Sequence, residues 1–219
     1  MKQRLIGLGD SITLGHWDEA GGWIAHVRRN ADARVVRTER EQYATVYNLG
    51  VSSNTSRHVL GRYRGEIDAR HDPGEGIDLF IVLAVGINDS AVNVGTDRHL
   101  VAPGDYETNM RALVSLARQD ASGRVLVMGP TPVDESKSRP VTFRPEREYR
   151  LDFIAEYNTI ARRVAADHGV CFADLFDGLR PHAGHWQEWD GVHLNALAHA
   201  QVASLVERKL IELGWGVSG

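Results

Sequence analysis

Residues 78–85 read DLFIVLAV, an unbroken apolar run after a single aspartate. The run is far shorter than the roughly 20 apolar residues that a helix needs to cross a bilayer. Its length and its β-branched residues favour a strand instead. Because the residues are apolar consecutively rather than alternately, both faces of this strand should be covered, as in a parallel sheet.

Four more segments have strand length and similar composition, and helical patterns fall between them. The other predicted strands are residues 4–8, 45–49, 124–128 and 170–173. Apolar residues repeat at helical spacing over residues 59–67, 106–117, 153–164 and 198–213, with Asp105 as the expected N-cap of the second helix. Strand alternating with helix predicts a doubly wound α/β sandwich with right-handed crossovers.

Composition and length favour one ordinary globular domain over residues 1–219. Hydrophobic residues make up 42% and charged residues 25% of the 24.3 kDa chain. A net charge of −4 argues against a general nucleic-acid binder.

No stretch has the length of a membrane span, and the sole cysteine, Cys171, excludes an internal disulfide framework. With no signal segment at the N-terminus, we expect a cytoplasmic protein unless a signal has been trimmed. The sequence indicates no oligomeric state.

Residues 5–15, LIGLGDSITLG, resemble both a phosphate-binding turn and a turn that presents a nucleophile. The dinucleotide fingerprint fails because Ile12 stands where its third glycine should be, and a P-loop fails because His16 rather than lysine follows Gly15. Ser11 directly follows a predicted strand, at the carboxyl edge where open α/β sheets place their ligands. Ser11 is therefore a candidate nucleophile, although this position taken alone would favour a helix cap.

Other stretches supply the partners that such a serine needs. Gly50 follows the second predicted strand and Asn88 the third, and both offer N–H donors of the kind that form an oxyanion hole. Near the C-terminus, Asp190 and His193 are three residues apart in WDGVHL. On a single helical turn, residues three apart are neighbours, so this spacing lets the carboxylate orient the imidazole as general base.

The stretches GDSITLG, NLG with Ser52, GIND and DGVH, in this order, resemble the four conserved blocks of the GDSL, or SGNH, hydrolases. The resemblance implies a flavodoxin-like α/β/α sandwich with a five-stranded parallel sheet. It implies Ser11 as nucleophile, His193 as general acid/base and Asp190 as the orienting carboxylate, with an oxyanion hole formed by Ser11, Gly50 and Asn88. One departure is that Ser53 follows Ser52 where the second block often ends in glycine, which affects the expected shape of that loop.

The same resemblance implies an esterase or acylhydrolase that acts on small-molecule esters through an acyl-serine intermediate. Its substrates would be esters of short acyl groups, acetylated sugars or lysolipids. The enzyme would need no metal and no cofactor. An acyltransferase with the same acyl-enzyme, and a non-catalytic binding protein on the same fold, are the alternatives.

Several residues near these blocks allow two interpretations. Asp10 and Asp89 are expected to be structural hydrogen-bonding residues. His182, His185, Asp190 and His193 form an alternative zinc cluster, which we disfavour because Asp190 and His193 have roles that need them free of metal. Trp186 and Trp189 either pack the loop that holds the Asp–His pair or form an apolar wall for the substrate.

The irregular segments 90–104 and 130–145 are interpreted as surface loops or as a pocket rim.

Overall fold

The apolar run at residues 78–85 forms strand β3 (Asp78–Ala84), the middle strand of a parallel sheet. The computed structural model describes residues 1–180, 184, 186–187 and 189–217. Within these residues the sheet has five strands in the order β2-β1-β3-β5-β7, which is the flavodoxin-like order. The remaining sheet strands are β1 (Lys2–Gly9), β2 (Tyr43–Gly50), β5 (Val125–Met128) and β7 (Cys171–Ala173).

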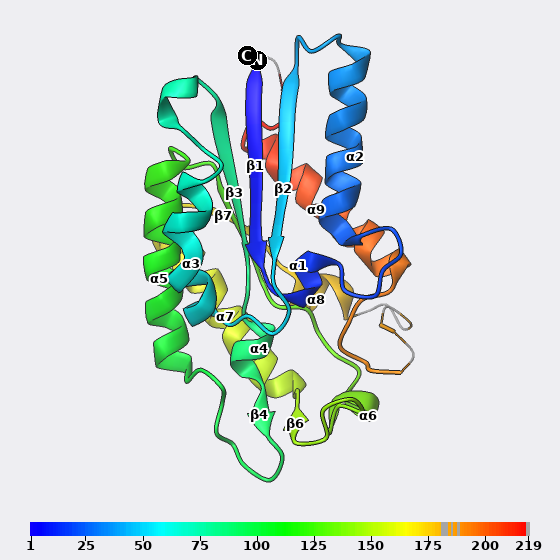
Figure 1. Cartoon of the computed structure of the whole chain (residues 1–219). Coiled ribbons are helices and arrows are strands. Elements are labelled where there is room, and N and C mark those ends of the chain that lie inside the picture. Colours follow the sequence, from blue (N-terminus) through cyan, green and yellow to red (C-terminus); the bar gives the residue numbers. More distant parts are fainter. Residues whose placement is uncertain (181–183, 185, 188, 218–219) are drawn as a thin grey trace.

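Helices cover both faces of the sheet, so the predicted three-layer α/β/α sandwich is confirmed (Figure 1). One face carries α3 (Ser56–Asp68), α5 (Pro103–Asp120) and α7 (Leu151–Asp167), whose buried side chains share a core with β1 and β3. The other face carries α2 (Gly22–Arg37) and α9 (Ala196–Glu212) in a second core. Burial on both faces explains why the β3 sequence is apolar at consecutive positions.

The register of the sheet brings the carboxyl ends of the central strands to one edge. Gly9 at the end of β1 pairs with Gly50 of β2 on one side and with Ala84 of β3 on the other. The short helices α1 (Ser11–Leu14) and α4 (Ile87–Ser90) begin just beyond this edge, on the side away from the two chain termini (Figure 1). The loops that follow β1, β2 and β3 therefore meet at one place.

The connections contain further short elements. Strand β4 (Val92–Asn93) lies in the segment 90–104 and pairs with β6 (Arg147–Glu148), just beyond the segment 130–145, in a two-stranded sheet. The short helices are η1 (Pro73–Glu75), α6 (Glu135–Ser138) and α8 (Leu175–Leu179). None of the described helices is long and apolar enough to span a membrane.

Two details of the helices differ from the sequence expectations. Asp105 is not the N-cap of α5, because the helix begins at Pro103 with Ala102 as N-cap. Proline lacks an N–H and has a fixed φ, which suits the first helical position, so the helix starts earlier and Asp105 lies in its first turn. Helix α2 was not predicted, since arginines and polar residues interrupt its apolar pattern.

Candidate active site

Ser11 is presented by a tight turn between β1 and the single-turn helix α1. Asp10 is the N-cap of this helix, and its carboxylate accepts a hydrogen bond of 2.9 Å from the Ile12 N–H. Gly15 ends the helix at φ 78°, in the left-handed region that favours glycine. Asp10 is 2% exposed, which agrees with its expected structural role and leaves Ser11 as the residue that faces the cavity.

Ser11, His193 and Asp190 are aligned as a hydrogen-bonded chain. His193 Nε2 lies 2.9 Å from Ser11 Oγ, and His193 Nδ1 lies 2.7 Å from Asp190 Oδ2. Since a carboxylate can only accept, the proton belongs on Nδ1, and Nε2 is left to accept from the serine hydroxyl. Asp190 is fully buried, so water does not compete for this orienting contact.

The spacing of Asp190 and His193 works through a tight loop and not through the helical turn that we expected. Asp190 Oδ1 accepts from the N–H groups of Val192 at 2.6 Å and His193 at 2.8 Å. Gly191 between them has φ 67°, which a side chain would disfavour. One oxygen of the Asp190 carboxylate therefore stabilises the backbone of the loop, and the other accepts from the imidazole.

Asn88 lies at the start of α4, directly after β3, with its side-chain amide fixed at both ends. Its Nδ2 donates to the Asn54 carbonyl at 3.0 Å, and its Oδ1 accepts from the Tyr149 hydroxyl at 2.9 Å. Because a backbone carbonyl can only accept, the contact with Asn54 sets which end of Asn88 is Nδ2, and the Tyr149 hydroxyl donates to the other end. The second Nδ2 hydrogen is left available for the cavity, as an oxyanion donor requires.

Gly50 does not have the position of an oxyanion donor, and this prediction is corrected. Its N–H donates to the Asn48 side chain at 2.9 Å, and Gly50 does not line the cavity that contains Ser11. A side chain at this position would collide with the backbone of Leu14. Glycine is needed here because β2 passes closely beneath α1.

Ser53 occupies the place that Gly50 was expected to fill. It lines the cavity together with Ser11 and Asn88, and its φ of 63° is in the left-handed region. Such a conformation is uncommon for a residue with a side chain and often marks a functional turn. The departure from the usual block, where Ser53 stands in place of glycine, therefore falls on the turn that faces Ser11.

A second buried carboxyl, Asp89, supports the loop next to Asn88. Both of its oxygens accept from the Ser56 N–H at 3.0 Å, so it ties α4 to the start of α3 as expected. Burial raises the pKa of Asp89 to about 6, and burial together with the nearby Asp89 charge raises the pKa of Asp10 to about 7.

The cavity that Ser11 lines measures about 710 Å³, including its open mouth. Segment 130–145 contributes Val141, Phe143 and Arg144 to its lining, so its interpretation as a pocket rim is supported. Segment 90–104 does not line this cavity among the described residues. It pairs with the rim from behind through β4 and β6.

An aromatic cluster lies beside His193. The Trp17 ring lies 4.4 Å from the His193 ring and 4.2 Å from the Trp189 ring, with Phe143 at 5.5 Å from Trp17. Trp189 is 47% exposed and contacts Trp17, but it is not among the residues that line the cavity. Trp186 packs instead: its indole N–H donates to the Pro132 carbonyl at 2.8 Å, and its ring contacts the core.

The alternative metal cluster is incomplete in the described part of the chain, because His182 and His185 lie outside it. The described residues contain no group of three or more histidine, cysteine, aspartate or glutamate side chains placed to hold a metal ion. Both ring nitrogens of His193 face Asp190 and Ser11.

The sequence analysis missed several residues of the cavity: Trp17, Ser53, Phe143, Arg147 and Tyr149. Ser53 was visible as the departure in the second block, and Phe143 falls in the segment considered as a rim. Arg147 and Tyr149 lie just beyond that segment, and their sequence carries no signal that they fold back to Ser11.

Together the fold and the site define a three-layer α/β/α hydrolase architecture with a serine–histidine–aspartate arrangement at the carboxyl edge of its sheet. Comparison with known proteins agrees with this. The sequence profile of the GDSL-like lipase/acylhydrolase family matches residues 8–201. The chain therefore belongs to this family of ester-hydrolysing enzymes.

Individual relatives are distant but extend over nearly the whole chain. A GDSL esterase/lipase of Arabidopsis thaliana is 26% identical, over 99% of this chain and 89% of the relative. The isoamyl acetate-hydrolyzing esterase 1 homolog of Mus musculus is 25% identical, over 97% and 84%. The crystal structure of a lipase/acylhydrolase from Enterococcus faecalis matches with a TM-score of 0.70 at 23% identity, covering 95% of both chains. This structural match supports the fold alone.

Proposed function

We propose that this protein is a serine esterase that cleaves short-chain carboxylic esters through an acyl-serine intermediate. The observation that carries the proposal is the continuous hydrogen-bonded chain from Asp190 through His193 to Ser11. It supplies a nucleophile, a base and an orienting carboxylate in the geometry that acyl transfer needs.

In the proposed mechanism, Ser11 Oγ attacks the ester carbonyl while His193 Nε2 takes the hydroxyl proton. The imidazolium formed is stabilised by the buried Asp190 carboxylate. His193 then protonates the leaving alcohol as the tetrahedral intermediate collapses to the acyl-serine. A water molecule, activated by the same nitrogen, releases the acid and restores Ser11.

We propose three donors for the oxyanion: the backbone N–H groups of Ser11 and Ser53 and the Asn88 side chain. Ser11 is the first residue of α1, where backbone N–H groups have no partner within the helix. Ser53 and Asn88 lie in the lining of the same cavity. Gly50 has no part in this set because its N–H is already bound to Asn48.

The aromatic cluster favours compact substrates with an apolar part. Trp17 and Phe143 line the cavity next to His193, where the leaving alcohol would depart. The mouse relative is named for hydrolysis of isoamyl acetate, an ester with a short acyl group and an apolar alcohol. We propose esters of this general size as substrates.

Labelling and hydrolysis test the proposal together. Wild-type protein should react with a fluorophosphonate probe and hydrolyse p-nitrophenyl acetate, and Ser11→Ala should lose both activities. Ser90→Ala is a matched control, since Ser90 is buried and hydrogen-bonded in α4 outside the cavity lining. Persistent labelling of the Ser11→Ala protein would identify a different nucleophile.

Hydrolysis and transfer use the same acyl-enzyme, so a second assay separates them. With an added alcohol, an acyltransferase would convert part of the acyl group into a new ester. An esterase would release the acid throughout, and a non-catalytic binding protein would show neither product nor labelling.

A further inference from the structure

The charge of the cavity lining is opposite to that of the whole chain. Arg144 and Arg147 line the cavity with Ser11 and His193, and no aspartate or glutamate is among the described lining residues. The chain as a whole has a net charge of −4. Two cations at a site of acyl transfer therefore need a specific explanation.

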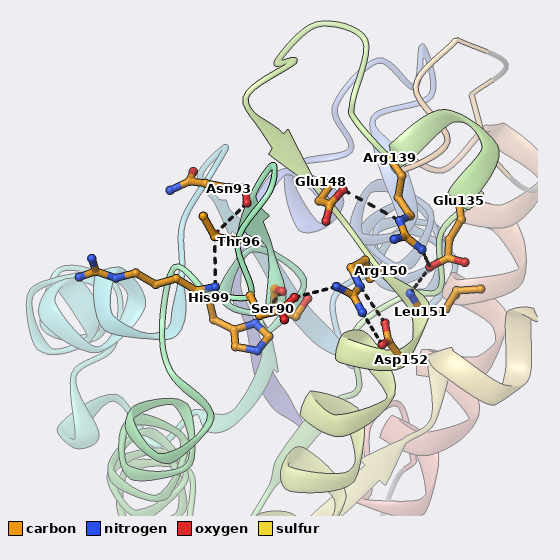
Figure 2. A network of polar contacts seen from close by, with 12 residues as sticks. Ser90, Asn93, Thr96, His99, Glu135, Arg139, Glu148, Arg150, Leu151 and Asp152 are labelled. Atoms are coloured by element: carbon orange, nitrogen blue, oxygen red, sulfur yellow. Dashed lines mark hydrogen bonds and ion pairs between the residues drawn. The ribbon is translucent and has the colours of Figure 1, made fainter.

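Strand β6 separates Arg147 from the carboxylates that neutralise its neighbours. Successive side chains of a strand point to opposite sides, so Glu148 faces away from Arg147. Figure 2 shows Glu148 contacting Arg139, at 4.0 Å, and Arg150 paired with Asp152, at 2.9 Å. These pairs form a polar network behind the rim.

Arg147 has no ion pair within the described residues, and its Nε is buried without a hydrogen-bond partner. Arg144, by comparison, lies 3.9 Å from Glu146 at the exposed end of the segment. A half-buried guanidinium without a counter-charge is costly unless a ligand supplies one. The planar guanidinium matches a carboxylate through two parallel hydrogen bonds.

We propose that this enzyme selects esters that carry a carboxylate, which Arg147 binds while Ser11 attacks the ester carbonyl. The proposal rests on the esterase function proposed above and specifies its substrate class. Both groups lie in the lining of one cavity, so one compact molecule can contact them together. Half-esters of dicarboxylic acids and esters of hydroxy acids have this chemistry.

A purely structural role for Arg147 is the alternative to exclude. Burial raises the pKa of Tyr149, and the Arg147 guanidinium beside its phenol opposes that rise. Tyr149 in turn holds Asn88. If Arg147 only positioned Tyr149, its loss would slow charged and neutral esters equally.

Matched ester pairs distinguish the two roles. One pair is 4-acetoxybenzoate and its methyl ester, with the charge on the alcohol side. The other is monomethyl and dimethyl glutarate, with the charge on the acyl side. We expect wild type to have a kcat/KM about 10- to 100-fold higher for the charged member of at least one pair, as a charge-assisted contact provides.

Arg147→Gln should remove this preference by raising KM for the charged ester, with kcat/KM for the neutral ester changed less than about threefold. Arg147→Lys should retain part of the preference because it keeps the charge without the planar fork. Arg139→Gln is the matched control, since Arg139 belongs to the network behind the rim, and it should keep the wild-type preference. Equal loss on charged and neutral esters in Arg147→Gln, or no preference in wild type, would overturn the proposal.

A binding measurement keeps the substrate class testable apart from catalysis. Glutarate should quench the fluorescence of Trp17 at the cavity mouth, with an affinity about 10-fold weaker in Arg147→Gln. If no ester is hydrolysed but glutarate binds in this Arg147-dependent way, the esterase function fails and the carboxylate site stands. Absence of binding, or tighter binding of inorganic phosphate than of glutarate, would contradict a carboxylate site.

Discussion

Replacing Asp10 by asparagine removes a carboxyl that burial makes costly to ionise, directly before the nucleophile. Burial raises the pKa of Asp10 from 3.8 to about 7. An asparagine oxygen can still accept the Ile12 N–H bond that caps α1. The substitution therefore changes the charge and largely keeps the cap.

The sign of the pH dependence follows from the direction of this shift. Between about pH 4 and pH 7, the folded protein holds the Asp10 proton while the unfolded chain has released it. The free energy of unfolding must therefore fall as pH rises through this window. A rise from 3.8 to about 7 corresponds to a loss on the order of 4 kcal/mol, at about 1.36 kcal/mol per pKa unit.

Asp10→Asn should escape this loss, so its stability relative to wild type should increase progressively from pH 4 to pH 8. The assay is urea unfolding of both proteins across this range, followed by tryptophan fluorescence. Asp89 titrates in both proteins with its pKa raised to about 6, so a residual slope is expected in each. The test is whether the difference in free energy of unfolding between Asp10→Asn and wild type changes with pH.

Asp72→Asn is a matched control for the cap. Asp72 is exposed and accepts from the Gly74 N–H at 2.8 Å at the start of η1. Because water hydrates this carboxylate, the substitution should give no comparable pH-dependent gain. If the difference in free energy of unfolding between Asp10→Asn and wild type stayed constant from pH 4 to pH 8, Asp10 would not have a raised pKa in the folded protein.

Three further substitutions test the site. Asn88→Ala should lower turnover of p-nitrophenyl acetate about 100- to 1000-fold through loss of an oxyanion donor, and unchanged turnover would remove Asn88 from the mechanism. Tyr149→Phe should lower kcat about 3- to 10-fold with little change in KM, since one hydrogen bond that orients the Asn88 amide is lost; a change in KM alone would contradict this positioning role. Gly50→Ala should lower the thermal midpoint by several degrees, because its Cβ collides with Leu14. A Gly50→Ala protein of wild-type stability would contradict this close contact between β2 and α1.

The five-stranded sheet and the residues of the Ser–His–Asp chain could be predicted from the amino-acid sequence. Consecutive apolar residues in 78–85 could be accommodated only where both faces of a strand are covered, and β3 lies in the middle of the sheet. Parallel strands end at one edge, so Ser11 after β1 and Asn88 after β3 had to be neighbours. The apolar pattern of each strand and the position of each residue directly after a strand were sufficient for these conclusions.

The other groups of the site could be identified only from the folded chain. Whether Gly50 or Ser53 presents its N–H to the cavity depends on the backbone angles of the loop after β2, and no residue type in that loop fixes them. Arg147 and Tyr149 reach the cavity because β6 pairs with β4 and folds the rim back over Ser11. These contacts join residues that are far apart in the sequence. The burial and the charged neighbours of each residue are therefore set only when the chain folds.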